Sequence, residues 1–260
     1  MKPIHTKKLE PGVALITGGA KRIGKKIAKN LARDGWKVVI HYNKNNIAAK
    51  KLKSEIIGSK GSAEIIKCDL NNYSSVKNLI EKSKKKFGSL SLLINNASKF
   101  ENDNIATLNI DSWDSHNNIN LKAPLFLSKD FSKQMKRNAP GLIINIIDQR
   151  IFFPNPEFIS YTSSKQSLMW LTQTLAQALS PQVRVCAIGP GPTLQGARQS
   201  KKDFENQSLS TPLMVGSNPE EIYQAVKFII DIPSFTGQMI TLDGGEHLDW
   251  IKKENKNFKD

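Results

Sequence analysis

The sequence predicts an α/β protein with a doubly wound parallel sheet of seven strands between two layers of helices. From residue 13 onward, short runs rich in β-branched residues alternate with longer segments of helical periodicity. This alternation is typical of βαβ units. A chain of 260 residues that is 39% hydrophobic can bury one large core, so we expect a single domain over residues 1–260.

The expected strands are short runs dominated by Val, Ile and Leu. They should lie at residues 13–17, 37–42, 63–68, 90–95, 142–147, 183–188 and 238–242. In the first helix, Ile23, Ile27 and Leu31 recur at helical spacing and mark its buried face. Further helices should lie at residues 46–57, 72–87, 111–137, 159–180 and 219–231.

Three stretches fall outside this alternation. Residues 193–218 lack a clear period. A long segment of this kind is more often a binding loop than a misread element, so we expect a substrate-binding loop there. The basic or polar ends of the chain, residues 1–10 and 251–260, are expected to be tails.

Composition argues against several classes of protein. The first apolar run, residues 13–17, is too short for a signal peptide or a membrane span, which predicts a cytoplasmic protein without a membrane partner. Cys68 and Cys186 form no CxxC pair and the four histidines are not clustered, so we expect neither a disulfide nor a metal site. The net charge of +15 comes from dispersed lysines without interleaved aromatic residues. We therefore expect no nucleic-acid partner, although a positive field can speed capture of an anionic cofactor or substrate.

A glycine-rich turn links the first expected strand to the first helix. It reads Thr17-Gly-Gly-Ala-Lys-Arg-Ile-Gly24. Glycines let the backbone approach a pyrophosphate closely, and the helix amino terminus offers unpaired N–H groups. An ordinary connection is the alternative. The position between a strand and a helix predicts that Thr17, Gly18, Arg22, Ile23 and Gly24 bind a dinucleotide cofactor.

The segment after the second strand indicates which cofactor is bound. An acidic residue there hydrogen-bonds the ribose of NADH and would repel the 2′-phosphate of NADPH. The sequence His41-Tyr-Asn-Lys-Asn-Asn contains no acid. A lysine between two asparagines can pair with a phosphate, so NADPH is the expected cofactor, with Tyr42, Asn43, Lys44 and Asn45 at its site. An ordinary surface lysine in a lysine-rich chain is the alternative.

Tyr161 and Lys165, four residues apart, are candidates for proton transfer. Residues at this spacing share one face of a helix, so the ammonium group should lower the pKa of the phenol from its usual value of about 10. Such a phenol can donate a proton as hydride reaches a neighbouring carbon. Spacing alone does not identify the pair, because it recurs at residues 73/77 and 223/227.

Position along the fold separates these pairs. Tyr161 lies between the fifth and sixth expected strands, where a helix begins near the carboxyl ends of the sheet. Tyr73 opens the helix after the third strand, and Tyr223 should flank the apolar stripe of its own helix. We therefore expect Tyr161 to face the cofactor.

The order of motifs over residues 11–248 resembles the short-chain dehydrogenase/reductase family, which implies a Rossmann-like fold. The matching residues are the TGGAKRIG loop, Cys68-Asp-Leu70, Asn95-Asn-Ala-Ser98, Asn120, Tyr161, Lys165, Pro190-Gly191 and the TGQMITLDGG segment. The resemblance implies that Asn120 completes a proton relay with Tyr161 and Lys165, and that the protein is a homotetramer. It also implies contacts along the cofactor from Asp69, Leu70, Asn96, Ala97, Ser98, Pro190, Gly191 and Thr193.

Two positions depart from the general pattern of the family. Arg22 replaces a glycine of the loop, and Asp148 replaces a serine that usually holds a substrate carbonyl. Together with Phe100 after the Asn-Ala-Ser run, these departures resemble the pteridine reductases and dihydromonapterin reductases. This narrower resemblance implies that Phe100 stacks a pterin ring against the nicotinamide, with Arg22 and Ser98 at its polar edge. A buried loop anchor is the alternative role for Phe100.

The sequence therefore predicts an NADPH-dependent oxidoreductase that reduces a dihydropterin, of the dihydrobiopterin, dihydromonapterin or dihydrofolate type, to its tetrahydro form. Reduction of a ring C=N bond needs a proton on nitrogen, and a carboxyl group with a raised pKa can supply it. The expected catalytic residues are Asp148, Tyr161, Lys165 and Asn120, and the expected substrate contacts are Arg22, Ser98, Phe100, Asp148 and Tyr161.

Two other functions are compatible with the same residues. One is a reductase of a carbonyl substrate such as a 3-oxoacyl thioester, in which Asp148 only replaces serine as a hydrogen-bonding group. The other is a regulator that binds NADPH without turnover. Fold alone does not decide between them.

Overall fold

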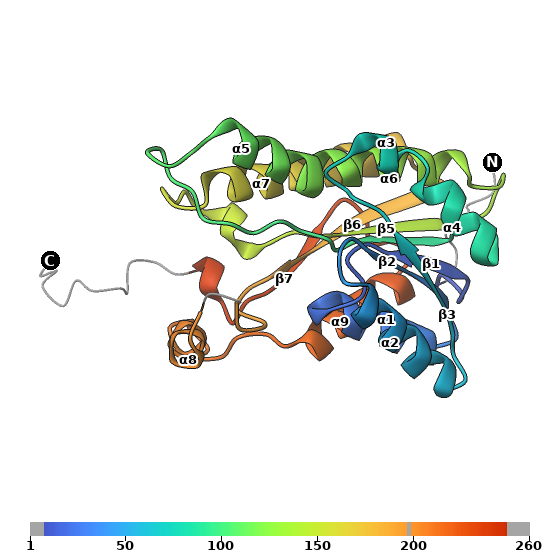
Figure 1. Cartoon of the computed structure of the whole chain (residues 1–260), viewed down its shortest axis with the longest axis horizontal. Coiled ribbons are helices and arrows are strands. Elements are labelled where there is room, and N and C mark those ends of the chain that lie inside the picture. Colours follow the sequence, from blue (N-terminus) through green and yellow to red (C-terminus); the bar gives the residue numbers. More distant parts are fainter. Residues whose placement is uncertain (1–7, 197–198, 249–260) are drawn as a thin grey trace, which may run out of the picture.

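Seven parallel strands form the centre of the protein. The computed structural model describes residues 8–196 and 199–248, and their strands form one sheet in the order β3-β2-β1-β4-β5-β6-β7. Every neighbouring pair is parallel. Helices cover both faces of the sheet (Figure 1), so the expected three-layer α/β fold is confirmed.

The strands are built from residues that favour burial on both faces. They are β1 (Val13–Ile16), β2 (Lys37–Tyr42), β3 (Ser62–Lys67), β4 (Leu92–Asn95), β5 (Gly141–Ile146), β6 (Val183–Pro190) and β7 (Met239–Leu242). β1, β4, β5 and β6 are buried along their whole length. Continuous apolar runs are typical of parallel strands covered on both sides, which explains why sequence patterns locate all of these strands.

Two helical layers enclose the sheet. One layer consists of α1 (Arg22–Arg33), α2 (Asn46–Gly58) and α9 (Pro219–Asp231). The other, at the top of Figure 1, consists of α3 (Tyr73–Val76), α4 (Leu79–Phe87), α5 (Ile110–Asn117), α6 (Ala123–Lys133) and α7 (Ile159–Ala178). Within the described residues, no helix is both long and apolar enough to cross a membrane.

Two predicted helices differ from the structure. The helix expected at residues 72–87 is divided between Val76 and Leu79 into α3 and α4. The helix expected at 111–137 ends at Lys133, and its middle is a π-helix, η1 (Asn118–Lys122). A hydrophobic period detects the buried face of a segment but not a local change in its hydrogen-bond spacing.

The segment expected to be a loop at residues 193–218 contains a helix, α8 (Lys201–Leu209). A capping box begins it: Ser200 Oγ accepts a hydrogen bond from the Asp203 N–H, and the Asp203 carboxylate accepts one from the Ser200 N–H. No residue of α8 is buried, so no apolar stripe predicts it. Residues 197–198 of this segment lie outside the described part of the chain.

The predicted tails are described only in part. Residues 1–7 and 251–260 lie outside the described ranges. In the amino-terminal segment predicted as a tail, Leu9 is buried in the hydrophobic cluster beneath α1 and α9, and its N–H donates to Ile230 O at 3.2 Å. The prediction of a tail is therefore wrong at Leu9, whose apolar side chain packs into the core.

The strand order creates a crevice at the carboxyl end of the sheet. From β1 the sheet extends outward through β2 and β3, and from β4 it extends in the opposite direction through β5, β6 and β7. In sheets of this kind, ligands bind where the connections diverge. The segments that follow β1 and β4 are the glycine-rich loop and residues 96–98, so the fold brings both to this crevice.

Arg184 on β6 holds the chain between α9 and β7, and its removal should destabilise the protein. Its buried guanidinium donates to the carbonyl oxygens of Ile229, Ile232 and Phe235 at 2.8 to 3.1 Å. Arg184→Met leaves these acceptors without donors, so we expect the free energy of unfolding to fall by about 2–4 kcal/mol in urea titrations. Arg137→Met, which removes an exposed arginine, should change it by less than about 0.5 kcal/mol. Equal losses in the two variants would contradict this role.

Candidate active site

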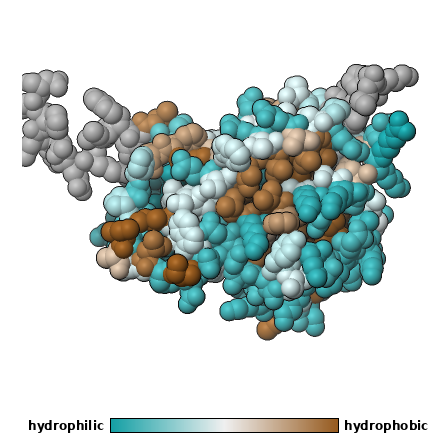
Figure 2. Space-filling model, turned by 90° about the horizontal axis from the view of Figure 1, so that it is seen from above, coloured by the Kyte–Doolittle hydropathy of each residue, from teal (hydrophilic) through white to brown (hydrophobic). Residues whose placement is uncertain are grey.

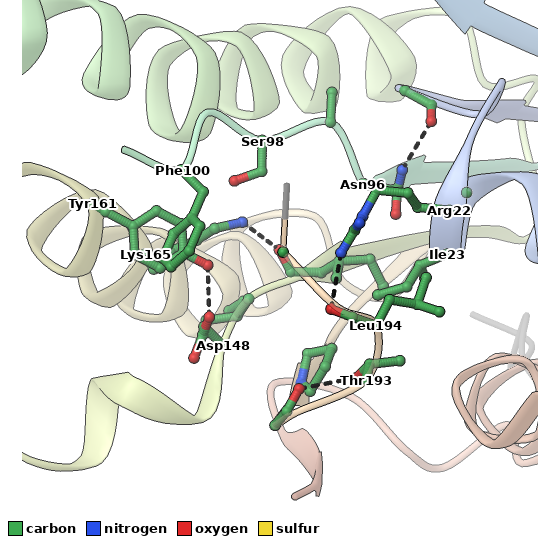
Figure 3. A pocket seen from close by; sticks show the side chains of 18 of the residues that line it. Arg22, Ile23, Asn96, Ser98, Phe100, Asp148, Tyr161, Lys165, Thr193 and Leu194 are labelled. Atoms are coloured by element: carbon green, nitrogen blue, oxygen red, sulfur yellow. Dashed lines mark hydrogen bonds between the residues drawn. The ribbon is translucent and has the colours of Figure 1, made fainter. Parts of the chain in front are cut away.

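A cavity of about 660 Å³ opens at the carboxyl ends of the strands. The segments that follow β1 to β6 and the start of α7 form its wall, part of which is seen in Figure 3. A cavity of this size can hold a small molecule. The predicted site residues on its wall are Gly18, Arg22, Ile23, Gly24, Asn43, Leu70, Asn96, Ala97, Ser98, Phe100, Asp148, Tyr161, Lys165, Pro190, Gly191 and Thr193.

The glycine-rich loop is shaped for close approach of its backbone. Gly18 has a positive φ of 61°, and a Cβ atom there would lie 2.9 Å from Ala97 Cα. A Cβ atom on Gly24 would lie 2.5 Å from Gly18 O. Neither position therefore accepts a side chain without distortion. The loop leads into α1, whose amino terminus points its N–H groups toward the cavity, an arrangement that suits a pyrophosphate.

Thr17 joins the ends of β1 and β4 beneath this loop. Its Oγ1 accepts from the N–H groups of Asn96 and Ala97 at 2.9 and 3.0 Å. Asn96 Nδ2 donates in return to Thr17 O at 2.8 Å. Thr17 is buried below the wall and so supports the predicted cofactor residues without lining the cavity itself.

Arg22 connects the glycine-rich loop with the segment after β6. It begins α1 with a positive φ of 52°, which explains why glycine is the usual residue at this position of the family pattern. Its guanidinium donates to Leu194 O at 3.1 Å (Figure 3) and to Gln195 O at 2.8 Å. In this structure Arg22 therefore anchors the predicted substrate-binding loop while its side chain lines the cavity.

The predicted cofactor residues of the segment after β2 differ in whether they line the cavity. Asn43 lines the wall, and its Nδ2 donates to Asp69 Oδ1 at 3.1 Å. Asn45 is the N-cap of α2, with its Oδ1 accepting from Ala48 N at 2.9 Å. Lys44 is exposed beside them, and Tyr42 packs against the core. Asn43 and Lys44 are thus the members of this predicted set that a phosphate could reach.

His41 is a residue of this region that motif reasoning missed. Its Nδ1 accepts from Gly18 N at 3.0 Å, which requires the tautomer whose Nε2 donates to Cys68 O at 3.0 Å. Burial lowers the pKa of His41 to about 4, so the ring is neutral near pH 7. The ring therefore holds the glycine-rich loop against the end of β3. The signal that could have found it is a histidine within an otherwise apolar, continuously buried run of β2.

Asp148 and Tyr161 form a hydrogen-bonded pair in the cavity. Tyr161 Oη donates to Asp148 Oδ2 at 2.6 Å (Figure 3), and the second carboxylate oxygen accepts from Arg150 N at 2.9 Å. Burial raises the pKa of Asp148, and the hydrogen bond from Tyr161 opposes this shift only in part. The carboxyl group is therefore biased toward its protonated form.

The pKa of Tyr161 differs from the sequence-based expectation. It lies well above 10, because burial and the neighbouring Asp148 disfavour the phenolate. Lys165 lies on the same face of α7, but its Nζ donates to Ile146 O at 2.8 Å and lies 5.8 Å from the centre of the Tyr161 ring. Burial lowers the pKa of Lys165 to about 8. The prediction that Lys165 lowers the phenol's pKa is thus wrong for this state of the site.

Asn120 contacts the loop after β4 through hydrogen bonds of its side chain. It lies in the π-helix η1, where its Oδ1 accepts from Lys99 N at 2.8 Å and from Ser98 Oγ at 3.2 Å. Its Nδ2 donates to Lys99 O and to Ser164 Oγ, each at 3.0 Å. The side chain thereby fixes this loop against α7. None of these contacts reaches Tyr161 or Lys165 directly, so the expected relay remains a prediction.

Phe100 lies at the mouth of the cavity and is not a buried loop anchor, since 45% of it is exposed. Its ring stacks parallel to Phe158 at 4.8 Å between centres and meets Tyr161 edge-on at 4.6 Å. Arg150 lies over both phenylalanine rings. Sequence reasoning missed Phe158 and Arg150, although both belong to the stretch between Asp148 and Tyr161.

The loop after β4 is tied to the start of α7. Asp103 is buried, and its carboxylate accepts from the N–H and the hydroxyl of Ser160. Asn102 Oδ1 accepts from Phe158 N at 3.1 Å. These bonds fix Phe100 relative to Tyr161. Within the described ranges, no group of three or more His, Cys, Asp or Glu residues could hold a metal ion.

The other two tyrosines with a lysine four residues later lie away from the cavity. Tyr223 is buried within α9 and its hydroxyl donates to Asp34, which confirms its structural role in that helix. The ring of Tyr73 packs edge-on against Phe126 at 4.8 Å. Position in the fold therefore separates Tyr161 from both.

The family model of the short-chain dehydrogenases matches residues 12–206, so the chain belongs to this family. A 3-oxoacyl-[acyl-carrier-protein] reductase from Synechocystis sp. is 30% identical over 237 residues, which cover 90% of this chain and 96% of that protein. The family expected from the order of the motifs is thus confirmed.

Two solved structures share more of the sequence. One is the FolM alternative dihydrofolate reductase 1 of Brucella canis complexed with NADP, with 41% identity, a TM-score of 0.91 and coverage of 95% of this chain and 98% of that one. The other is its counterpart from Brucella suis, also in complex with NADP, with 42% identity, a TM-score of 0.90 and coverage of 93% and 97%. Their names agree with the narrower resemblance to pterin and folate reductases.

The neutral ring of His41 predicts a specific loss of stability in acid. Its folded pKa of about 4 lies below the unfolded value of 6.5, so the unfolded chain takes up a proton first and stability falls as the pH drops through this window. In urea titrations, the free energy of unfolding should be lower near pH 5 than near pH 7.5, and His41 should account for about 2 kcal/mol of this decrease. The His41→Gln variant should be less stable near pH 7.5 but lack this part of the pH dependence. An unchanged dependence would exclude His41 as its source.

Proposed function

We propose that the protein reduces a dihydropterin to the tetrahydro form with NADPH as the hydride donor. The hydrogen bond between Tyr161 and Asp148 carries this proposal, because it joins the phenol of the family's proton-transfer pair to a carboxyl group with a raised pKa. The proposal treats the chain as one reductase domain, since its strands form a single sheet.

The residues of the crevice fit NADPH. Gly18 and Gly24 leave room for the pyrophosphate at the amino terminus of α1. The segment after β2 contains no acidic residue, and its Asn43 and Lys44 suit the 2′-phosphate. Asp69 and Leu70 would frame the adenine, while Pro190, Gly191 and Thr193 would lie along the nicotinamide half. NADPH, when bound, supplies the hydride.

The proton would come from the acid pair. Reduction of a C=N bond adds hydride to carbon and a proton to nitrogen, and the proton leaves either the Asp148 carboxyl or the Tyr161 phenol, which share a hydrogen bond. The buried ammonium of Lys165 would stabilise the phenolate that forms when Tyr161 gives up its proton. Phe100 offers an exposed ring on which a flat bicyclic substrate could stack next to Tyr161, with Arg22 and Ser98 at its polar edge.

A carbonyl reductase is the second candidate, favoured by the likeness to 3-oxoacyl-[acyl-carrier-protein] reductases. In that case Asp148 would only orient the substrate oxygen. Binding of NADPH without turnover of any substrate would instead indicate a regulator. A panel of dihydropterins and 3-oxoacyl thioesters, with NADPH consumption as the readout, separates the three functions.

The protein's assembly and location are part of the same proposal. We expect a cytoplasmic homotetramer without nucleic-acid or membrane partners. Hydrophobic residues gather in patches on the face seen in Figure 2. On the helices of the upper layer in Figure 1, α5 exposes Ile110 and Trp113, and α7 exposes Trp170. Such a patch supports self-association. Light scattering on the purified protein would measure the oligomer.

Asp148→Asn should abolish most of the pterin reduction. Asparagine keeps the shape and an acceptor for Arg150 N, but it has no acidic proton to transfer, so kcat should fall at least about 100-fold. In the wild type, kcat/KM should fall as the pH rises through the raised pKa of Asp148, because the carboxyl group works protonated. That pH dependence should be absent in the variant.

Two readouts control this experiment. Burial of the Asp148 carboxylate destabilises the fold above its pKa, so the variant should unfold no more readily than wild type near pH 8. Asp148→Ser should raise turnover of a 3-oxoacyl thioester if the carbonyl reductase is the true activity. Unchanged reduction of dihydropterin in the Asp148→Asn variant would rule out the acid role.

Lys44→Glu should change the choice of cofactor. A carboxylate at this exposed position would repel the 2′-phosphate, so we expect KM for NADPH to rise about tenfold or more and KM for NADH to change much less. Lys85→Glu makes the same change of charge on an exposed residue of α4, and it should leave both values near those of wild type. A similar rise in the two variants would point to the overall charge instead of Lys44.

A further inference from the structure

Arg150 lies on the wall of the cavity with its guanidinium over two aromatic rings. Its Cζ atom is 5.0 Å from the centre of the Phe158 ring and 5.9 Å from that of Phe100. Its side chain is partly exposed at the wall. Among the described residues, no hydrogen bond or ion pair engages this guanidinium.

Two acidic groups of this region, Asp148 and Glu157, already have other partners. Asp148 accepts from the Tyr161 hydroxyl and, with its other oxygen, from the main chain of Arg150. Glu157 accepts from the side-chain amides of Asn102 and Asn104 at 2.8 and 3.4 Å. A guanidinium that stacks on a ring face keeps its N–H groups directed outward in its own plane. The fork of Arg150 is therefore available to a planar anion that enters the cavity.

Arg150 lies at the end of the cavity where the substrate is expected, next to Asp148 and Phe100. It belongs to the short helix η2 (Gln149–Phe152), which begins directly after Asp148, and the hydrogen bond from Arg150 N to Asp148 holds the two in register. Phe100, the ring expected to stack the substrate, lies between Arg150 and Tyr161 in this contact network. The cofactor residues Gly18 and Arg22 belong to the separate wall formed by the β1–α1 loop.

We propose that Arg150 binds an anionic group on the side chain of the pterin substrate, either a carboxylate or a phosphate, and so selects conjugated pterins over neutral ones. This inference rests on the proposed pterin reduction. A bidentate pair with a planar carboxylate suits the guanidinium fork, and the Phe158 ring beside it suits an aromatic spacer. Both features favour the aminobenzoyl-glutamate side chain of a folate as the source of the anion.

The test compares substrates that differ in the charge of this side chain. Initial rates with NADPH are measured for 7,8-dihydrofolate, 7,8-dihydroneopterin monophosphate and the neutral 7,8-dihydrobiopterin. The readout is the ratio of kcat/KM for each anionic substrate to that for dihydrobiopterin. In Arg150→Met this ratio should fall about tenfold for the anion that Arg150 binds, mainly through KM. In Arg150→Lys, which keeps the positive charge but not the planar fork of N–H groups, the ratio should fall less.

Arg137→Met is the matched control, because it removes one exposed arginine at the opposite end of the sheet, before β5. Its ratios should equal those of wild type. NADPH affinity, measured by fluorescence titration, and thermal unfolding report whether Arg150→Met disturbs the cofactor site or the fold.

The outcomes distinguish the two proposals. A selective loss for dihydrofolate assigns the anion to a carboxylate, and a selective loss for the monophosphate assigns it to a phosphate; either supports the inference. If the wild type reduces all three pterins and Arg150→Met changes their kcat/KM values by the same factor, or leaves them unchanged, the inference is overturned while pterin reduction stands. If the wild type reduces none of them, both proposals fail.

Discussion

The meeting of β1 and β4 at the centre of the sheet is the constraint on which the site depends. Because the sheet extends from these two strands in opposite directions, their carboxyl ends leave a crevice. The Thr17 hydroxyl closes its base by accepting from the two N–H groups that follow β4, and His41 holds the glycine-rich loop from the β2 side. The backbone that would face a cofactor is thus fixed by three neighbouring strands, all built for burial on both faces.

Within this frame, burial shifts Asp148 and Lys165, the two ionisable groups of the proposed reaction, toward their neutral forms. It raises the pKa of Asp148 and lowers that of Lys165 to about 8. The carboxyl group keeps its proton more firmly and the ammonium group loses its proton more easily than either would in water. In the proposed reduction, the raised pKa of Asp148 would keep a proton available near neutral pH for a weakly basic ring nitrogen. A serine in place of Asp148 would provide a hydrogen bond but no such donor.

Sequence patterns predicted the parts of the structure that arise from burial and from tight turns. Runs such as VALIT and LIINII can satisfy their backbone and side chains together only as covered parallel strands. Gly18 and Gly24 stand where any Cβ atom would clash. Tyr161 could be separated from Tyr73 and Tyr223 because the order of elements determines which tyrosine reaches the strand ends.

Features that depend on contacts between distant segments could not be predicted in this way. α8 has no buried face, and its signal is only the Ser200–Asp203 capping box. The direction of the Tyr161 pKa was wrong because spacing along a helix does not show that Lys165 Nζ donates to Ile146 O or that Asp148 is the nearer charged group. Arg150 was missed because nothing in the adjacent sequence shows that its side chain lies over Phe158. The left-handed backbone of Phe158 at the start of α7 presents this ring.

The pair of hydrogen bonds from Arg22 to the carbonyl oxygens of Leu194 and Gln195 limits how this protein can be changed. The segment after β6, with α8 on it, is the part of the wall that would be exchanged to alter substrate preference. Here one end of that segment is anchored to the first residue of α1, at a position where the general family pattern has glycine. A grafted segment whose backbone follows a different path would not present its carbonyl oxygens to Arg22, and the guanidinium would then lose both acceptors. Recombination among family members must therefore exchange the two segments together.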